Sequence, residues 1–288
     1  MEPTKKNCLV SNDYQNKFGI TACMGLLVFI CSSIVPAHAV IEYDIKPEKE
    51  VSRWSGYVSA GYTRNVYGAE SYHAYEAFNV DGRVSYRADW GNLMLTLGGE
   101  QEMLHGKESS FYDPFLEYRT PIYHLSSTVT VKGSAGVYLP ASRYSKRDNL
   151  QYAPRVGAYV FWSPLEKLQF YVSPRYRYNA YQYQTAGERV LIEHQFDTLV
   201  DAFWMIDSNL YLEMNGRYRI SKNYYGRRMD DSFTFAQELG WQFNEDWVLA
   251  LGHNNSGGFY HPEIGSSKGF DIYNKKSSTF YLSVTKYL

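Results

Sequence analysis

The stretch from Val80 to Gly99, VDGRVSYRADWGNLMLTLGG, alternates apolar and polar residues along two arms joined by the turn Asp-Trp-Gly-Asn. Successive side chains of a strand point to opposite faces, so this pattern predicts a β-hairpin with one apolar face and one face of arginines and aspartates. A water-soluble sheet buries its apolar face, whereas a membrane barrel turns that face to lipid. The rest of the chain has to decide between the two. The apolar positions are Val80, Val84, Leu93, Leu95 and Leu97.

The composition limits the classes of protein. The chain has 288 residues and a formal net charge of -1, which gives no support to a nucleic-acid partner. Aromatic residues reach 17%, which is typical of chains that place many amphipathic rings at a membrane interface. The mean hydropathy of -0.43 is too low for a helical membrane protein.

Residues 1–39 have the features of a cleaved signal peptide. Early lysines supply positive charge, an apolar run too short for a spanning helix begins at residues 25–30, and Ala37-His38-Ala39 matches a small-x-small cleavage site. A lipoprotein signal through Cys31 is the weaker alternative, because Ile30 is too large for the position before a lipidated cysteine. All three cysteines lie in this segment, so the mature chain cannot be held by disulfides.

The alternation of the opening stretch returns throughout residues 54–288, after a polar periplasmic lead at residues 40–53. Short turns and long polar connections alternate strictly, as expected for an up-and-down barrel with tight turns at one rim and extended loops at the other. We therefore predict an all-β fold, a transmembrane antiparallel β-barrel of about twelve strands in the outer membrane of a Gram-negative bacterium. The predicted strands are 54–65, 76–89, 92–102, 111–120, 126–140, 154–163, 168–180, 190–204, 209–221, 233–243, 247–254 and 277–288.

The charged residues of these strands fall on the face opposite the apolar one. So many charges cannot form a dry core without a prohibitive desolvation cost, so they are expected to line a wet lumen. The inward cations form pairs two or four residues apart, which would build ladders of guanidinium groups that bind carboxylates and raise the local anion concentration. The predicted substrate-binding residues are Arg83, Arg87, Arg119, Lys132, Arg155, Arg175, Arg177, Arg217 and Arg219.

An alternative role for these cations is structural. The lumen is also expected to contain acidic residues that pair with the arginines and only stabilise the barrel. The charges of the two signs nearly balance, and we favour the anion pathway over this alternative. The inward acids are Asp81, Glu117, Asp197, Asp201, Glu213 and Glu238, with Glu193 beside them.

A second candidate site follows strand 247–254, in the sequence LGHNNSGG. A histidine near a serine permits a hydrolase reading in which His253 takes the proton of Ser256. The surrounding asparagines and glycines are ordinary loop residues, so the simpler interpretation is a loop. Neither catalytic residues nor a cofactor are expected, and the scattered histidines do not predict a metal site. The longest loop, 255–276, is rich in glycine and aromatic residues.

The region from Tyr152 to Asn223 resembles the oligogalacturonate-specific porins of the KdgM type, a family that includes the sialic-acid channel. The most specific element is RYRYNAY, Arg175 to Tyr181, on the strand after the turn at residues 163–167, and NGRYRISKN follows it. The resemblance implies a monomeric outer-membrane channel with two arginine tracks that pass acidic sugars. Arg175, Arg177, Arg217 and Arg219 match the positions of these tracks.

We accordingly expect a passive, anion-selective channel for acidic oligosaccharides such as oligogalacturonate, alginate fragments or sialic acids. Outer-membrane lipid and lipopolysaccharide are the expected partners of the outer wall. Two alternatives stay open: a barrel enzyme that acts on lipid through His253 and Ser256, and a structural or surface-binding barrel with a closed lumen.

Overall fold

The computed structural model of the chain describes residues 18–21, 40–43, 52–104, 106–261, 266–267 and 269–288. The chain forms two compact units. In the smaller unit, strand β1 (Phe18–Thr21) pairs antiparallel with β2 (Val40–Tyr43). Most of the expected signal peptide (1–39) and periplasmic lead (40–53) falls outside the described residues, so both assignments stay predictions.

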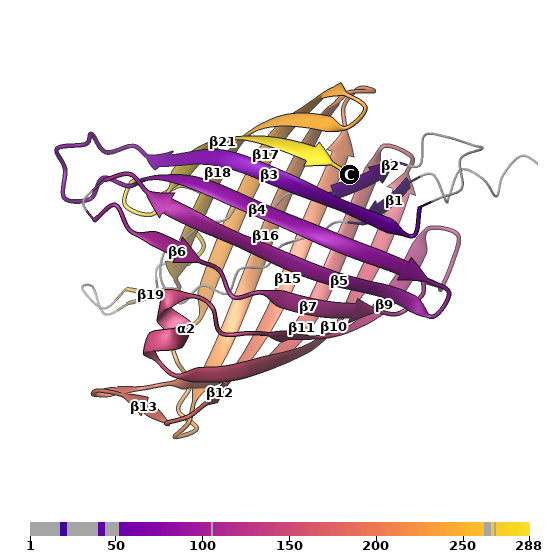
Figure 1. The fold of residues 1–288 in the computed structure, drawn as a ribbon. Helices are drawn as coiled ribbons and strands as arrows, with labels where there is room; N and C mark the ends of the chain where they lie inside the picture. The colour runs from indigo at the N-terminus through magenta and orange to yellow at the C-terminus, as the bar shows by residue number, and fades with distance from the viewer. Residues whose placement is uncertain (1–17, 22–39, 44–51, 105, 262–265, 268) are drawn as a thin grey trace, which may run out of the picture. The chain divides into compact units, whose positions relative to one another are not determined.

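The larger unit is a closed, all-β barrel whose described residues supply twelve antiparallel strands. Each strand pairs with the one before and the one after it, and β21 pairs with β3 to close the ring (Figure 1). Closure leaves no open sheet edge to satisfy, which is the condition for a sheet to span a bilayer. The strands are β3 (Trp54–Asn65), β4 (Glu76–Ala88), β5 (Gly91–Glu102), β7 (Phe115–Arg119), β9 (Val129–Tyr138), β10 (Leu150–Leu165), β11 (Leu168–Tyr178), β15 (Ile192–Met205), β16 (Leu210–Asn223), β17 (Ser232–Asn244), β18 (Trp247–Gly258) and β21 (Thr279–Tyr287).

The connections contain small additional elements. A short helix, α2 (Arg143–Arg147), is capped by Ser142, whose side chain accepts a hydrogen bond from the N–H of Ser145. Among the described residues, no helix is long and apolar enough to cross a membrane. The remaining short strands are β6 (Ser109–Phe111), β8 (Tyr123–His124), β12 (Ala180–Tyr181), β13 (Thr185–Ala186), β14 (Arg189–Val190), β19 (Tyr260–His261) and β20 (Ser266–Ser267).

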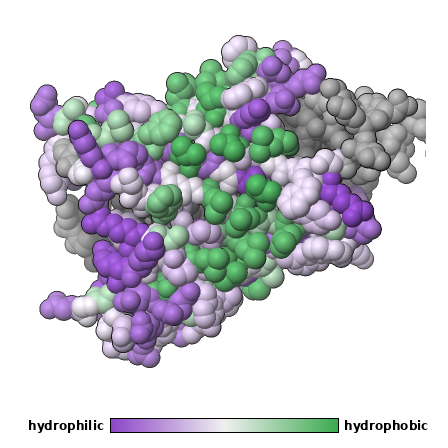
Figure 2. All heavy atoms as spheres, in the orientation of Figure 1, coloured by the Kyte–Doolittle hydropathy of each residue, from purple (hydrophilic) through white to green (hydrophobic). Residues whose placement is uncertain are grey.

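The barrel wall is apolar outside and polar inside. Burial alternates residue by residue along the strands, and the exposed positions are largely hydrophobic. Figure 2 shows hydrophobic side chains gathered across the middle of the wall and hydrophilic ones at the end that carries the long loops. A water-soluble protein does not expose such a band, whereas a barrel in lipid requires it. This is the arrangement of an outer-membrane barrel. The exposed residues include Val80, Val84, Leu93, Leu95, Leu97, Val160, Val172, Leu239, Leu251 and Leu282.

Tryptophans mark the rim of the short turns. Each of the five exposed tryptophans lies at a strand end next to a short connection or at the start of β3. Amphipathic rings at that level are the expected interface girdle of a membrane barrel. These residues are Trp54, Trp90, Trp162, Trp204 and Trp241.

Candidate functional site

Six arginines project inward from β7, β10, β11 and β16. The register of the strands explains this common direction. Arg155 on β10 lies directly opposite Arg177 on β11. Asp197 on β15 lies opposite Arg175 on one side and Arg219 on the other. Directly opposed residues share a face, so the period-2 pattern of each strand places these side chains on one inner wall. All six are buried: Arg119, Arg155, Arg175, Arg177, Arg217 and Arg219.

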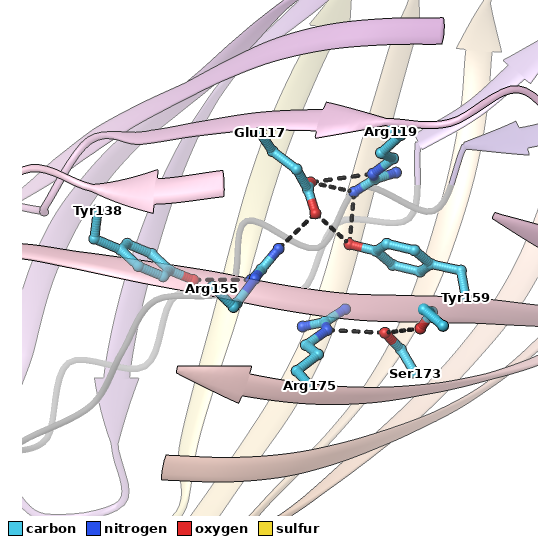
Figure 3. Close-up of polar contacts among 8 residues, drawn as sticks. Glu117, Arg119, Tyr138, Arg155, Tyr159, Ser173 and Arg175 are labelled. Carbon is cyan, nitrogen blue, oxygen red and sulfur yellow. Dashed lines mark hydrogen bonds and ion pairs between the residues drawn. The ribbon is translucent and has the colours of Figure 1, made fainter. Parts of the chain in front are cut away.

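Glu117 neutralises two of these arginines at once (Figure 3). Its Oε2 accepts hydrogen bonds from Nε and Nη2 of Arg119, at 3.0 and 2.9 Å. Its Oε1 accepts from Nη2 of Arg155 at 2.6 Å and from the Tyr159 hydroxyl at 3.0 Å. Arg155 also donates from Nη1 to the hydroxyl of Tyr138 at 2.9 Å. A carboxylate shared in this way stabilises both cations but leaves less of their charge for a solute.

Arg219 is neutralised by a different acid. Its Nε lies 2.6 Å from Oδ1 of Asp197, and its Nη2 lies 3.1 Å from Oδ2, which is a bidentate pair on adjacent strands. The structural role that we weighed against the anion pathway therefore applies to Arg119, Arg155 and Arg219.

Arg175 and Arg177 differ from these three because no described carboxylate pairs with them. Arg175 donates from Nε to the Ser173 hydroxyl at 2.9 Å, while its Nη1 and Nη2 have no hydrogen-bond partner among the described residues. Nε and Nη1 of Arg177 also have none. Each guanidinium lies over a ring: Arg175 over Tyr159 at 5.2 Å, and Arg177 over Tyr138 at 4.5 Å. The rings hold the cations by a cation–π contact and leave their N–H groups available to an anion.

The other three predicted cations differ from one another in burial and in their contacts. Arg83 of β4 is buried and lies 5.1 Å from the centre of the Tyr57 ring. Lys132 of β9 is half-buried, with Nζ 5.9 Å from the Phe161 ring. Arg87 is exposed at the end of β4, beside the short turn, because its inward position coincides with the barrel rim.

Sequence reasoning missed the aromatic part of the site. The search for lumenal residues considered only charged side chains. The alternation that places Arg155 inward also places Tyr159 inward, because the two are four residues apart on β10. Likewise, Val137 was predicted to face outward, so its neighbour Tyr138 on β9 must face inward. The inward aromatic residues of this wall are Phe115, Tyr138, Tyr159, Phe161 and Tyr171.

The histidine and serine of LGHNNSGG do not form a catalytic pair. Strand β18 continues to Gly258, so these residues are in a strand and the loop prediction was wrong. His253 and Ser256 are three residues apart and face opposite sides of the wall: His253 contacts the ring of Phe280 at 5.0 Å, and Ser256 is the partner of the inward Thr234. Among the described residues, no group of acids, histidines or cysteines could hold a metal ion.

The described part of the longest loop packs on the outer wall. Phe270 contacts the outward-facing Phe233 and Phe235, with ring centroids 5.0 and 5.7 Å apart. Asn255 donates from Nδ2 to the carbonyl of Asp271 at 2.6 Å and accepts a hydrogen bond from the Ser277 hydroxyl at 2.7 Å. Residues 262–265 and 268 lie outside the described residues.

No protein-family model matches the chain, and no curated protein matches its sequence. Solved structures do match it. The KdgM porin is 8% identical, with 80% of this chain and 98% of that chain covered and a TM-score of 0.46. The outer-membrane channel DcaP of Acinetobacter baumannii is 10% identical, with 82% and 96% covered and a TM-score of 0.43. The trimer form of OmpT, an outer membrane protein of Vibrio cholerae, is 6% identical, with 82% and 98% covered and a TM-score of 0.42. At these identities the likeness concerns the fold alone.

Proposed function

We propose that this barrel is a passive outer-membrane channel for anionic solutes of the acidic-oligosaccharide class, such as oligogalacturonate-, alginate- or sialic-acid-like chains. The observation that carries the proposal is the pair Arg175 and Arg177, which have no carboxylate partner among the described residues and whose Nη1 and Nη2 (Arg175) and Nε and Nη1 (Arg177) lack hydrogen-bond partners there. A guanidinium remains charged at any physiological pH and binds a carboxylate through two N–H groups. No covalent step and no cofactor are proposed.

The remaining cations would also contribute to the pathway, but they differ in how strongly they would hold an anion. Arg119, Arg155 and Arg219 have carboxylate partners, so they would hold an anion more weakly than Arg175 and Arg177 do. Arg83, Lys132 and Arg217 extend positive charge along the lumen, whereas Arg87 is placed where a solute would leave toward the short turns. A water-filled lumen that is lined by fixed positive charge concentrates anions.

The outer wall requires lipid, and outer-membrane lipid and lipopolysaccharide are its proposed partners. We propose a monomer: the ring closes within one chain through the pairing of β21 with β3, so no second copy is needed to complete the wall.

Ion selectivity of the purified protein in planar bilayers tests the proposal. The reversal potential under a salt gradient should show anion preference, and Arg175→Gln combined with Arg177→Gln should reduce it. Arg64→Gln is the matched control, since Arg64 is an exposed arginine on the outward face of β3. A channel without anion preference, or a preference unchanged in the double variant, contradicts the proposal.

A structural barrel with a closed lumen is the second candidate. The observation that favours it is that the inward charged side chains are almost all buried, with Arg177 4% exposed and Glu213 1% exposed. In the same bilayer experiment such a barrel inserts but does not conduct. The enzymatic alternative has no comparable support, because His253 and Ser256 face opposite sides of β18.

A further inference from the structure

Strands β11 and β15 carry a row of buried polar groups that the described protein leaves without hydrogen-bond partners. Besides the two arginines, the atoms are the hydroxyl of Tyr171, both side-chain polar atoms of Gln195, and Oδ2 of Asp201. Buried polar groups in native structures are almost always satisfied, so a row of exceptions on two adjacent strands needs a binding partner that the protein itself does not supply.

The row has two chemically different ends. Gln195 is the partner of Arg177, whereas Asp201 is the partner of Tyr171, which comes four residues before Arg175 on β11. At a strand rise of about 3.3 Å per residue, the Cα atoms of Arg175 and Asp201 are about 13 Å apart along the wall. One end therefore presents N–H donors with positive charge, and the other presents a carboxylate acceptor.

Unlike other inward acids, Asp201 has no arginine or tyrosine partner among the hydrogen bonds and ion pairs of the described residues. Glu117 and Asp197 pair with arginines, and Glu238 accepts hydrogen bonds from the hydroxyls of Tyr211 and Tyr281 at 2.6 and 2.7 Å. Asp201 is only 2% exposed, and the buried Glu213 of β16, two residues from Asn215, the partner of Asp201, places a second carboxyl group on the same face beside it. A buried acidic pair attracts a cation that can donate hydrogen bonds.

We propose that the channel takes amphoteric solutes, namely acidic oligosaccharides that also carry a free amino group. Arg175 and Arg177 hold the carboxylate of one sugar, and Asp201 with Tyr171 holds the ammonium group of a neighbouring sugar. The ammonium donates to Oδ2 of Asp201 and to the lone pair of the Tyr171 hydroxyl. This inference rests on the proposed channel function and names the solute for the same wall.

Two probes of matched length test it: a hyaluronan tetrasaccharide and the same tetrasaccharide after removal of its N-acetyl groups, which exposes ammonium groups and leaves the carboxylates in place. The measurement is the residence time of each probe, read from current blockades of the full-length protein in planar bilayers. The de-N-acetylated probe should reside about tenfold longer in the wild type, as expected for one charge-assisted hydrogen-bonding contact.

Asp201→Asn should abolish this difference while the residence time of the acetylated probe is unchanged, and Tyr171→Phe should reduce it. Glu238→Gln is the control, because this acid lies on the same inner wall but has both oxygens occupied; it should preserve the difference. Equal residence of the two probes in the wild type, or a difference that survives Asp201→Asn in a folded barrel, overturns the inference. In that case an anion preference that depends on Arg175 still stands, whereas loss of that preference counts against the channel itself.

Discussion

Arg155 and Arg177 are direct partners across β10 and β11, and both guanidinium groups lie over the ring of Tyr138, at 5.7 and 4.5 Å. Like charges directly opposite one another destabilise a sheet. Here the ring of Tyr138 faces both cations, and Glu117 pairs with one of them. Of the two opposed cations, Arg155 is therefore neutralised by a carboxylate, whereas Arg177 is held by the ring and pairs with no described carboxylate.

The role of Tyr138 can be separated into its hydroxyl and its ring. Tyr138→Phe removes the hydrogen bond from Arg155 and should lower the free energy of unfolding by about 1.5 to 3 kcal/mol, as for a bond to a charged group. Tyr138→Leu also removes the cation–π contacts and should cost about 0.5 to 2 kcal/mol more. Urea unfolding of the barrel in lipid vesicles measures both. Equal stability of the two variants would show that the ring contributes nothing.

Glu117→Gln should make the barrel less stable and more anion-selective. The variant leaves Arg119 and Arg155 without their carboxylate, and loss of one partner of a buried ion pair costs about 3 to 5 kcal/mol. The same change adds uncompensated positive charge to the lumen, so the reversal potential should shift toward greater anion preference. Unfolding in urea and the bilayer recording check the two effects, and a lower anion preference contradicts the assignment.

Gly252 permits the contact between Tyr281 and Glu238. A Cβ at this position would overlap Cζ of the Tyr281 ring, so Gly252→Ala must displace the tyrosine that donates to Glu238. We expect a loss of about 1 to 3 kcal/mol, as for other overpacked sites. Gly216→Ala is the control, because its nearest neighbour is the carbonyl oxygen of Thr234 at 4.0 Å. If both variants have the same thermal midpoint, the close approach is not a constraint.

Asn255 should hold the outer-wall loop. Asn255→Ala removes the hydrogen bonds to Asp271 and Ser277, so trypsin should cleave after the exposed Lys275 and Lys276 faster than in the wild type. Ser256→Ala changes the next residue of the same strand on the opposite face and should not alter cleavage. Digestion of the detergent-solubilised barrel, followed by mass spectrometry, distinguishes the two results.

A surface ion pair gives a pH-dependent signal. The hydrogen bond from Arg228 holds the pKa of Asp231 below its usual value, with Nε of Arg228 3.0 Å from Oδ1. A carboxyl whose pKa is lowered by folding contributes stability above the unfolded value, near pH 3.9, and loses it as the pH falls through the folded value. The Hε resonance of Arg228 should therefore titrate with a midpoint below about 3.9. A midpoint at or above that value means that the pair does not form in solution.

The strands were predictable because their signal is local. The expected strand 54–65 coincides with β3 (Trp54–Asn65), and most other limits agree within a few residues. The expected strand 111–120 is instead interrupted, with β6 ending at Phe111 and β7 beginning at Phe115. Pro114 lies in the gap, and a proline cannot donate a hydrogen bond to the sheet ladder. The expected end of β18 at residue 254 was too early, because asparagine and glycine are common in loops, whereas here partners on β17 extend the ladder to Gly258.

The barrel and the inward face of most charged strand residues followed from the sequence, because alternation with period 2 and the order of short and long connections are properties of neighbouring residues. Arg87, which is exposed at the rim, is an exception. Only the tertiary structure decided which arginines are neutralised. Glu117 meets Arg155 from 38 positions away, and Asp197 meets Arg219 from 22 positions away. Ion pairs between strands depend on strand order, register and side-chain reach, and none of these is encoded in the residues next to either partner.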